Sequence, residues 1–232
     1  MSLLDGLDST VFEVLGQRVI WSDLVGNLLG LTALALGWRR SVWTWPVQLA
    51  SGLILVAAYA SVELGGGVGK QLLVMTVAVW GWHRWRAGPR DGADDRIVVR
   101  FATGRERLLL TAGAIGGTLA VGGLFTAFPV LSWNPWPDAY IFVGTLVAMI
   151  AQARGLVEFW FAWLLVDLVG VPLAFSSGLA FSGLVYILYF VLVLWGLRSW
   201  WLRTRAGDTD GRADPATPVP AIDTTAREGT AQ

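Results

Sequence analysis

Acidic side chains and amides lie inside stretches of this sequence that are otherwise apolar. Asp167 stands within the run 157–175, Glu158 stands near the start of that run, and Gln48 and Asn27 lie in earlier runs. A charged group at the centre of a membrane helix costs about 2.5–3.5 kcal/mol, which makes such residues candidates for function. An amide adds both a hydrogen-bond donor and an acceptor for a polar ligand.

Tryptophans accompany these polar residues. Trp160 and Trp163 lie in the run that holds Asp167, and Trp45 precedes Gln48 by three residues, which places those two on one face of a helix. A tryptophan presents a flat apolar face against which a planar ligand can stack. We predict that Trp45, Trp160 and Trp163 contact a ligand, whereas most of the 14 tryptophans anchor helices at a membrane–water interface.

The composition requires a membrane. Of the 232 residues, 55% are hydrophobic and 15% are charged, whereas about 25% are charged in a soluble domain. A chain this apolar would not cover its surface in water. The net charge of zero disfavours nucleic-acid binding, which usually needs a basic protein. We therefore expect an all-α membrane protein.

Seven apolar runs have about the 20 residues that are needed to cross ~30 Å of hydrocarbon. They cover approximately 22–38, 43–62, 69–86, 107–128, 137–154, 157–175 and 179–202. We also expect an interfacial segment over 1–20, a charged loop over 87–106 and a disordered tail over 206–232. Within the first segment, Val11, Phe12, Val14 and Leu15 suit a short amphipathic helix.

Basic residues are divided unevenly between the two ends of these spans. Of the 17 Lys and Arg, all except Arg18 and Lys70 fall on the side that holds the charged loop and the tail. Lysine and arginine favour cytoplasmic loops. We therefore predict a multi-pass plasma-membrane protein with its N-terminus outside and its C-terminus in the cytoplasm.

The chain aligns with itself, without gaps, when it is shifted by 115 residues. Arg39 then falls on Arg154 and Trp45 falls on Trp160. The pattern W-G-x-x-x-W at 80–85 falls on the same pattern at 195–200. Matches at Trp and Arg in one register indicate an internal repeat, because apolar residues alone would match by chance.

Each predicted half, 21–86 and 137–202, holds three spans, and the glycine-rich span 107–128 returns the chain to its starting side. This 3+1+3 parallel pseudo-repeat is a transporter architecture. The glycines of the linking span are expected to let helices pack closely. We expect a central site lined by every span except 107–128. In this site, Tyr186 is the repeat-equivalent of Gln71, because it lies 115 residues further along the chain.

The candidate substrate-binding residues are Asn27, Trp45, Gln48, Gln71, Trp80, Glu158, Trp160, Trp163, Asp167 and Tyr186. Glu158 has a second interpretation, because a carboxylate near a helix end is explained equally well by contact with water. For Asp167, which lies deeper in its span, we favour a buried pair or a ligand contact.

The halves 21–86 and 137–201 resemble those of the PnuC-type vitamin transporters. The resemblance is carried by Trp-Thr-Trp-Pro at 43–46, the stretch 69–85, Glu-Phe-Trp-Phe-Ala-Trp at 158–163 and Val-Asp at 166–167. It implies a SWEET-like seven-helix fold that is commonly trimeric. It also implies vitamin uptake by facilitated diffusion, with phosphorylation in the cytoplasm as the trap.

Two positions depart from the pattern of the nicotinamide riboside carriers of this family. Ala78 stands where those members have asparagine, and Phe159 stands where they have the asparagine of Glu-Asn-Trp. The loss of two amides predicts a less polar site, which suits a flavin ring. The stretch 37–43 also resembles the riboflavin-transporting actinobacterial branch, so we favour riboflavin, with nicotinamide riboside as the alternative.

Other functions stay open as alternatives. A proton-coupled carrier would use Glu158 or Asp167 as a relay, and a receptor would bind the vitamin without transporting it. A membrane enzyme is disfavoured, because His83 is the single histidine and the chain has no cysteine. The same two facts disfavour a dedicated zinc or copper site. We expect no cofactor, no metal and no catalytic residue.

Overall fold

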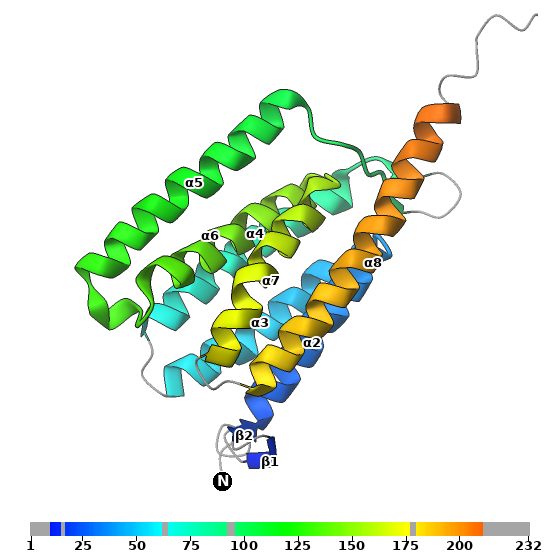
Figure 1. Ribbon diagram of the computed structural model, residues 1–232. Coiled ribbons are helices and arrows are strands. Elements are labelled where there is room, and N and C mark those ends of the chain that lie inside the picture. The colour runs from blue at the N-terminus through cyan, green and yellow to red at the C-terminus, as the bar shows by residue number, and fades with distance from the viewer. Residues whose placement is uncertain (1–9, 15–16, 62–64, 92–95, 177–179, 211–232) are drawn as a thin grey trace, which may run out of the picture.

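The computed structural model describes residues 10–14, 17–61, 65–91, 96–176 and 180–210. In this part of the chain, seven α-helices run side by side as a bundle (Figure 1). They are α2 (Trp21–Trp38), α3 (Thr44–Ser61), α4 (Gly65–Ala87), α5 (Gly104–Ala127), α6 (Pro135–Ala153), α7 (Glu158–Ser176) and α8 (Ala180–Asp210). The predicted seven-helix, all-α fold is confirmed.

Three of the described helices have the length and composition of membrane spans. Three long apolar segments, Gly104–Ala127, Glu158–Ser176 and Gly183–Arg205, suffice to cross a bilayer by length and composition, and Leu24–Trp38 and Thr44–Ala57 are shorter apolar helices. Large apolar side chains such as those of Leu108, Ile115 and Leu168 are exposed on the outside of the bundle. An exposed apolar surface of this extent is suited to lipid rather than to water.

The N-terminal segment differs from the expected amphipathic helix. Strands β1 (Thr10–Val14) and β2 (Gln17–Ile20) pair antiparallel, with an irregular register between Thr10 and Phe12. Threonine, valine and phenylalanine favour extended backbone, and the run is too short to propagate a helix by itself. The prediction of a helix here is wrong for Val11, Phe12 and Val14, and Leu15 lies outside the described residues.

Two other expected irregular regions contain regular structure. The loop 87–106 holds the short strands β3 (Arg90–Asp91) and β4 (Arg96–Ile97), which pair antiparallel. Helix α8 continues to Asp210, so the first five residues of the expected tail, 206–210, are helical. The rest of that tail, 211–232, lies outside the described residues.

An extended segment, 96–103, crosses the end of the bundle where α2 and α6 end. Ile97 donates its N–H to the carbonyl of Arg40 (3.5 Å), and Arg100 donates its N–H to the carbonyl of Gly155 (3.0 Å). Arg40 and Gly155 both have left-handed backbone, with φ of 59° and 67°. They lie 115 residues apart in the sequence, so one segment joins two matching helix ends.

The start of α5 fixes the far end of this segment. Thr103 and Glu106 form a capping box, in which each side chain accepts the other residue's backbone N–H. Glu106 also accepts two hydrogen bonds from Arg100, of 2.7 and 2.8 Å, which raise the pKa of the Arg100 guanidinium. These contacts tie α5 to the segment that precedes it.

Tryptophan–glycine contacts pack α3 against α4 and α7 against α8. A Cβ on Gly81 would lie 2.5 Å from the ring of Trp45, and a Cβ on Gly196 would lie 2.2 Å from the ring of Trp160. Gly196 lies 115 residues after Gly81, and Trp160 lies 115 residues after Trp45, so the two contacts are repeat-equivalent. In each pair, only glycine leaves room for the indole ring at the helix interface.

A second set of contacts joins the first three helices to the last three. The indole N–H of Trp85 on α4 donates to the carbonyl of Gln152 on α6 (3.0 Å). The indole N–H of Trp200 on α8 donates to the carbonyl of Trp38 on α2 (3.0 Å). Trp85 and Trp200 are also separated by 115 residues. The two bonds therefore start from matching tryptophans, whereas their acceptor carbonyls are 114 residues apart, one residue out of that register.

The glycines of α5 have two different environments. Gly117 and Gly122 face Val143 and Trp136 of α6, where an added Cβ would lie 2.8 and 2.5 Å from those side chains. An added Cβ on three others, Gly113, Gly116 and Gly123, would meet nothing within 4 Å. Close packing within the chain thus uses only one stripe of the glycine-rich helix.

Candidate functional site

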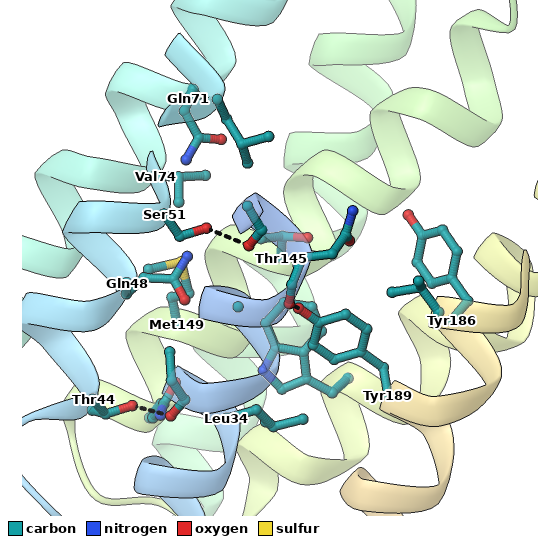
Figure 2. Close-up of a pocket in the computed structure, with 18 of the residues that line it drawn as sticks. Leu34, Thr44, Gln48, Ser51, Gln71, Val74, Thr145, Met149, Tyr186 and Tyr189 are labelled. Carbon is teal, nitrogen blue, oxygen red and sulfur yellow. Dashed lines mark hydrogen bonds between the residues drawn. The ribbon is translucent and has the colours of Figure 1, made fainter. Parts of the chain in front are cut away.

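A cavity of about 400 Å³ lies inside the bundle. Residues of α2, α3, α4, α6, α7 and α8 form its wall, and α5 contributes none of the lining residues in the described part of the chain. Figure 2 shows Gln48, Ser51 and Gln71 at one side of this space and Tyr186 and Tyr189 at the other. Cavities of about 300–1,000 Å³ with a few convergent polar groups are typical small-molecule sites.

The cavity brings together seven of the ten residues that the sequence singles out. They are Asn27, Trp45, Gln48, Gln71, Trp163, Asp167 and Tyr186. Trp45 and Gln48 lie one turn apart on α3, and Trp163 and Asp167 lie one turn apart on α7. Each helix thus presents an aromatic ring and a polar group to the same space. Their role in binding remains a prediction.

The other two tryptophans of the predicted set lie away from the cavity. Trp80 is 39% exposed on α4, with the guanidinium of Arg84 5.7 Å from its ring centroid. Trp160 is completely buried between α7 and α8, where its ring contacts Gly196 and meets Trp200 edge to face. Neither ring belongs to the cavity wall.

Glu158 also lies outside the cavity, at the start of α7. Its carboxylate accepts the backbone N–H of Ala102 (2.8 Å) and forms an ion pair with Arg107 (2.8 Å). The side chain is 16% exposed. Glu158 therefore fastens the segment 96–103 and the start of α5 to α7, and these contacts account for an acidic residue at a helix end.

Several cavity residues were missed by the sequence analysis. The polar ones are Thr44, Ser51, Thr145, Gln152 and Tyr189. The hydroxyls of Ser51 and Thr145 donate to the carbonyls of Gly26 (3.0 Å) and Ile141 (2.8 Å). Hydroxyls within apolar spans, and a second tyrosine one turn after Tyr186, were the signals that could have found them.

Three polar atoms of the cavity residues are buried without a hydrogen-bond partner in the described part of the chain. They are Asp167 Oδ2, Trp45 Nε1 and Trp163 Nε1. A buried polar group that is left unpaired costs about 1–3 kcal/mol. One acceptor and two donors are thus available to a ligand or to water at this wall.

The charges at the cavity wall set a limit on the ligand. Asp167 is the one charged residue among those that line it, and the described wall includes no Lys, Arg or His. Phosphate esters are bound in proteins chiefly by arginine, lysine and helix N-termini. The wall therefore fits a neutral or cationic ligand with hydrogen-bonding edges better than a phosphorylated one.

The two departures from the nicotinamide riboside pattern do not act at this wall. Ala78 and Phe159 are both completely buried in the core, and neither lines the cavity. The wall carries four amides, those of Asn27, Gln48, Gln71 and Gln152. The cavity is therefore more polar than expected, and these two positions supply no argument for a flavin.

Comparisons with known proteins agree with a membrane carrier. The model of a family described as nicotinamide mononucleotide transporters matches residues 20–202. The riboflavin/roseoflavin transporter RibM of Streptomyces davaonensis is 61% identical over 202 residues, covering 87% of this chain and 94% of RibM. The nicotinamide riboside transporter PnuC of Escherichia coli is 23% identical, covering 80% of this chain and 87% of PnuC.

One solved structure has the same fold. The crystal structure of a vitamin B3 transporter, PnuC, superposes with a TM-score of 0.66 at 19% sequence identity. The match covers 80% of this chain and 83% of that one. Together, the family match, the 61% identical relative and the shared seven-helix fold show that the chain belongs to the nicotinamide mononucleotide transporter family.

Proposed function

We propose that this protein is a plasma-membrane carrier that takes up riboflavin by facilitated diffusion. The observation that carries the proposal is the cavity, whose wall offers aromatic rings, amides and unpaired polar atoms but includes no basic residue. The choice of riboflavin within the family is supported by the relative of 61% identity, which is a riboflavin/roseoflavin transporter.

The chemistry of riboflavin suits this wall. Its ring system is flat, with carbonyl acceptors and one N–H donor on the same edge, and its side chain carries several hydroxyls. Trp45 and Trp163 would contact the ring, and their indole N–H groups would donate to its acceptors. Asp167 Oδ2 would accept the ring N–H. The amides of Gln48, Gln71 and Asn27 would bind the hydroxyls.

Phosphorylation in the cytoplasm would make uptake effectively one-way. The product carries a dianionic phosphate, and the described cavity wall has no basic group to receive it. The phosphorylated vitamin would therefore bind the site weakly and would not leave the cell through it. Phosphorylation would also keep the cytoplasmic concentration of the free vitamin low, so the net flux would run inward. A passive carrier needs no other energy source under this scheme.

The doubled contacts of the bundle support a carrier with two moving halves. The first three helices and the last three each form a unit, held by the Trp45–Gly81 and Trp160–Gly196 contacts, and the cavity lies between the units. The proposed motion is a rocking of these halves about the cavity, as in other parallel-repeat carriers. We infer a homotrimer from the resemblance alone.

Uptake of labelled riboflavin by cells without a riboflavin carrier tests the proposal. Expression of the protein should give accumulation that saturates with substrate and disappears with the Asp167→Asn variant. The matched control is Asp138→Asn, an acidic residue at the start of α6 that does not line the cavity. No accumulation, with the protein present in the membrane, would overturn the proposal.

Nicotinamide riboside is the second candidate substrate, because the family match and the E. coli relative point to that vitamin class. A pyridinium cation would pair with the Asp167 carboxylate. The same cells should then accumulate nicotinamide riboside in preference to riboflavin.

Two other mechanisms have their own signatures. A carrier coupled to protons would show uptake that collapses when an ionophore is added. A receptor would bind the vitamin in vesicles without any flux across the membrane.

A further inference from the structure

A second pocket, of about 640 Å³, lies at the end of the bundle where α2 and α4 end and α3 begins. Its wall differs from that of the cavity, because four arginines, the exposed Trp43 and the partly buried Trp82 make up most of it. The residues that matter are Arg39, Arg40, Arg86, Arg96, Trp43 and Trp82. No acidic residue lines it in the described part of the chain. Arg39 and Arg86, whose side chains are exposed, are the two arginines of this wall that can turn toward a ligand.

Two of these arginines, Arg40 and Arg86, contact neighbouring groups of the protein. Arg40 is only 6% exposed, has left-handed backbone, and donates to the carbonyl of Ile97 (3.2 Å). The guanidinium of Arg86 lies 5.7 Å from the ring centroid of Trp82 on the same helix. Arg39 is exposed. The pocket thus combines one buried arginine with two exposed ones, Arg39 and Arg86.

The corresponding corner of the second half provides an internal comparison. At the positions 115 residues further on, Gly155 replaces Arg40 and Trp201 replaces Arg86. There, the ring of Trp201 packs edge to face against Phe101 at 5.1 Å. Arg154 keeps the position of Arg39, and the guanidinium of Arg205 lies 4.9 Å from the ring centroid of Trp201. The two corners therefore differ at the positions of Arg40 and Arg86, which are arginines in the first half alone.

We propose that this pocket binds a phosphate ester. Planar guanidinium groups bind phosphate oxygens through paired hydrogen bonds, and arginine also stacks on tryptophan while doing so. Trp43 also lines the pocket and is 68% exposed, and an exposed indole suits the boundary between lipid and water. The second pocket thus favours a ligand with a phosphate group, whereas the cavity favours a ligand without one.

Two sources of phosphate ester reach such a pocket. One is the headgroup of an anionic phospholipid, because basic pockets near helix ends at a membrane surface bind such headgroups. The other is the phosphorylated vitamin, which would link intracellular product to the carrier. Only this second source rests on the proposed function. Both sources share the phosphate that the arginines recognise, and the experiment separates them.

The test uses the purified full-length chain and native mass spectrometry with three probes: phosphatidylglycerol, phosphatidylcholine and flavin mononucleotide. Excess riboflavin is present to fill the cavity. The variant is Arg39→Gln with Arg86→Gln, and the matched control is Arg105→Gln with Arg198→Gln, two exposed arginines outside the pocket. Losing two charged hydrogen-bond donors should weaken binding of a phosphate probe by about tenfold or more.

A selective loss for phosphatidylglycerol would identify a lipid site, and a selective loss for flavin mononucleotide would identify a product site. Equal weakening by the control pair, or equal binding of phosphatidylcholine and phosphatidylglycerol with no binding of flavin mononucleotide, would overturn the proposal. Riboflavin binding is measured separately on each variant. It should stay unchanged, so failure of the pocket and failure of the proposed cavity function remain distinguishable.

Discussion

Asp167 is buried to 1% exposure in the wall of the cavity, and one of its carboxylate oxygens has no hydrogen-bond partner among the described residues. An acidic group in such a place destabilises a membrane helix unless something binds it. Its neighbours at the wall are amides, hydroxyls and aromatic rings, none of which carries a positive charge. A ligand N–H is therefore the partner that the wall best accommodates.

The first prediction concerns this carboxylate. Asp167→Asn should weaken riboflavin binding by about tenfold or more, because a hydrogen bond to a charged acceptor is worth about 1.5–3 kcal/mol. The measurement is a titration of the purified variant, followed by quenching of flavin fluorescence. Glu158→Gln should bind riboflavin like the parent protein, since Glu158 lies outside the cavity. Weaker riboflavin binding by Glu158→Gln than by Asp167→Asn would refute the assignment of Asp167 to the binding site.

The second prediction separates two tryptophans of α7. The indole N–H of Trp163 lies at the cavity wall without a described partner, whereas Trp160 is enclosed by protein. Trp163→Phe should raise the dissociation constant for riboflavin several-fold and reduce quenching. Trp160→Phe should lower the melting temperature and leave that constant nearly unchanged. Equal effects of both variants on binding would contradict this distinction.

These two residues also show the limit of prediction from the sequence. The sequence analysis predicted a ligand contact for both Trp160 and Trp163, because both are aromatic residues in one apolar span near Asp167. Helix α7 is apolar all round, so no stripe of polar residues reveals which face meets the cavity. That face depends on how α7 is rotated against α6 and α8, a property of packing in three dimensions. Whether Thr145, Gln152 and Tyr189 reach the cavity depends in the same way on the rotation of α6 and α8, although their polar side chains in apolar spans were a signal in the sequence.

At the scale of the elements, the helices are locked together by tryptophan rings that fit over glycines. The third prediction is that Gly196→Ala lowers the thermal stability, because its Cβ would lie 2.2 Å from the ring of Trp160. Overpacking of this kind costs about 1–3 kcal/mol. Gly123→Ala is the control, since nothing lies within 4 Å of its Cβ. Similar melting temperatures for both variants would refute the packing argument.

The segment 96–103 is the element that joins the two matching helix ends. The fourth prediction is that Glu158→Gln loosens it, because the ion pair with Arg107 is lost and the bond to the Ala102 N–H is weakened. Hydrogen exchange of the amides in 96–103 should become faster. Arg105→Gln changes an exposed residue of α5 other than Arg107 and should leave that exchange unchanged. Unaltered exchange in Glu158→Gln would show that backbone hydrogen bonds alone hold the segment.

The N-terminal hairpin and the long α8 mark the limits of sequence-based prediction at this scale. Short runs such as 10–14 carry too few residues to separate a helical period from an alternating one. Helix α8 runs past the expected boundary although Gly207, Asp208 and Thr209 are weak helix formers, and no proline lies within Ala180–Asp210 to end it. The long apolar spans were predictable, because bilayer thickness fixes their length.

At the scale of the whole molecule, the distribution of charge distinguishes the two ends of the bundle. The segment 96–103, the arginine-lined pocket and the turn at 154–157 gather at one end, and the 3₁₀ helix η1 (Pro129–Leu131) lies between α5 and α6 at the other. Anionic lipid is in excess on the cytoplasmic side of a membrane, and it attracts the end of the bundle that holds the arginine-lined pocket. We therefore predict an orientation that has the arginine-rich end inside the cell.

The fifth prediction tests this orientation directly. Because the chain has no cysteine, a single introduced cysteine is the only site of labelling by a maleimide. Val130→Cys, at 88% exposure between α5 and α6, should react with a membrane-impermeant maleimide added to intact cells. Ala87→Cys, exposed at the end of α4, should react only after the cells are opened. The opposite pattern would place the arginines outside, and would remove the product-binding role from the second pocket while leaving the cavity unaffected.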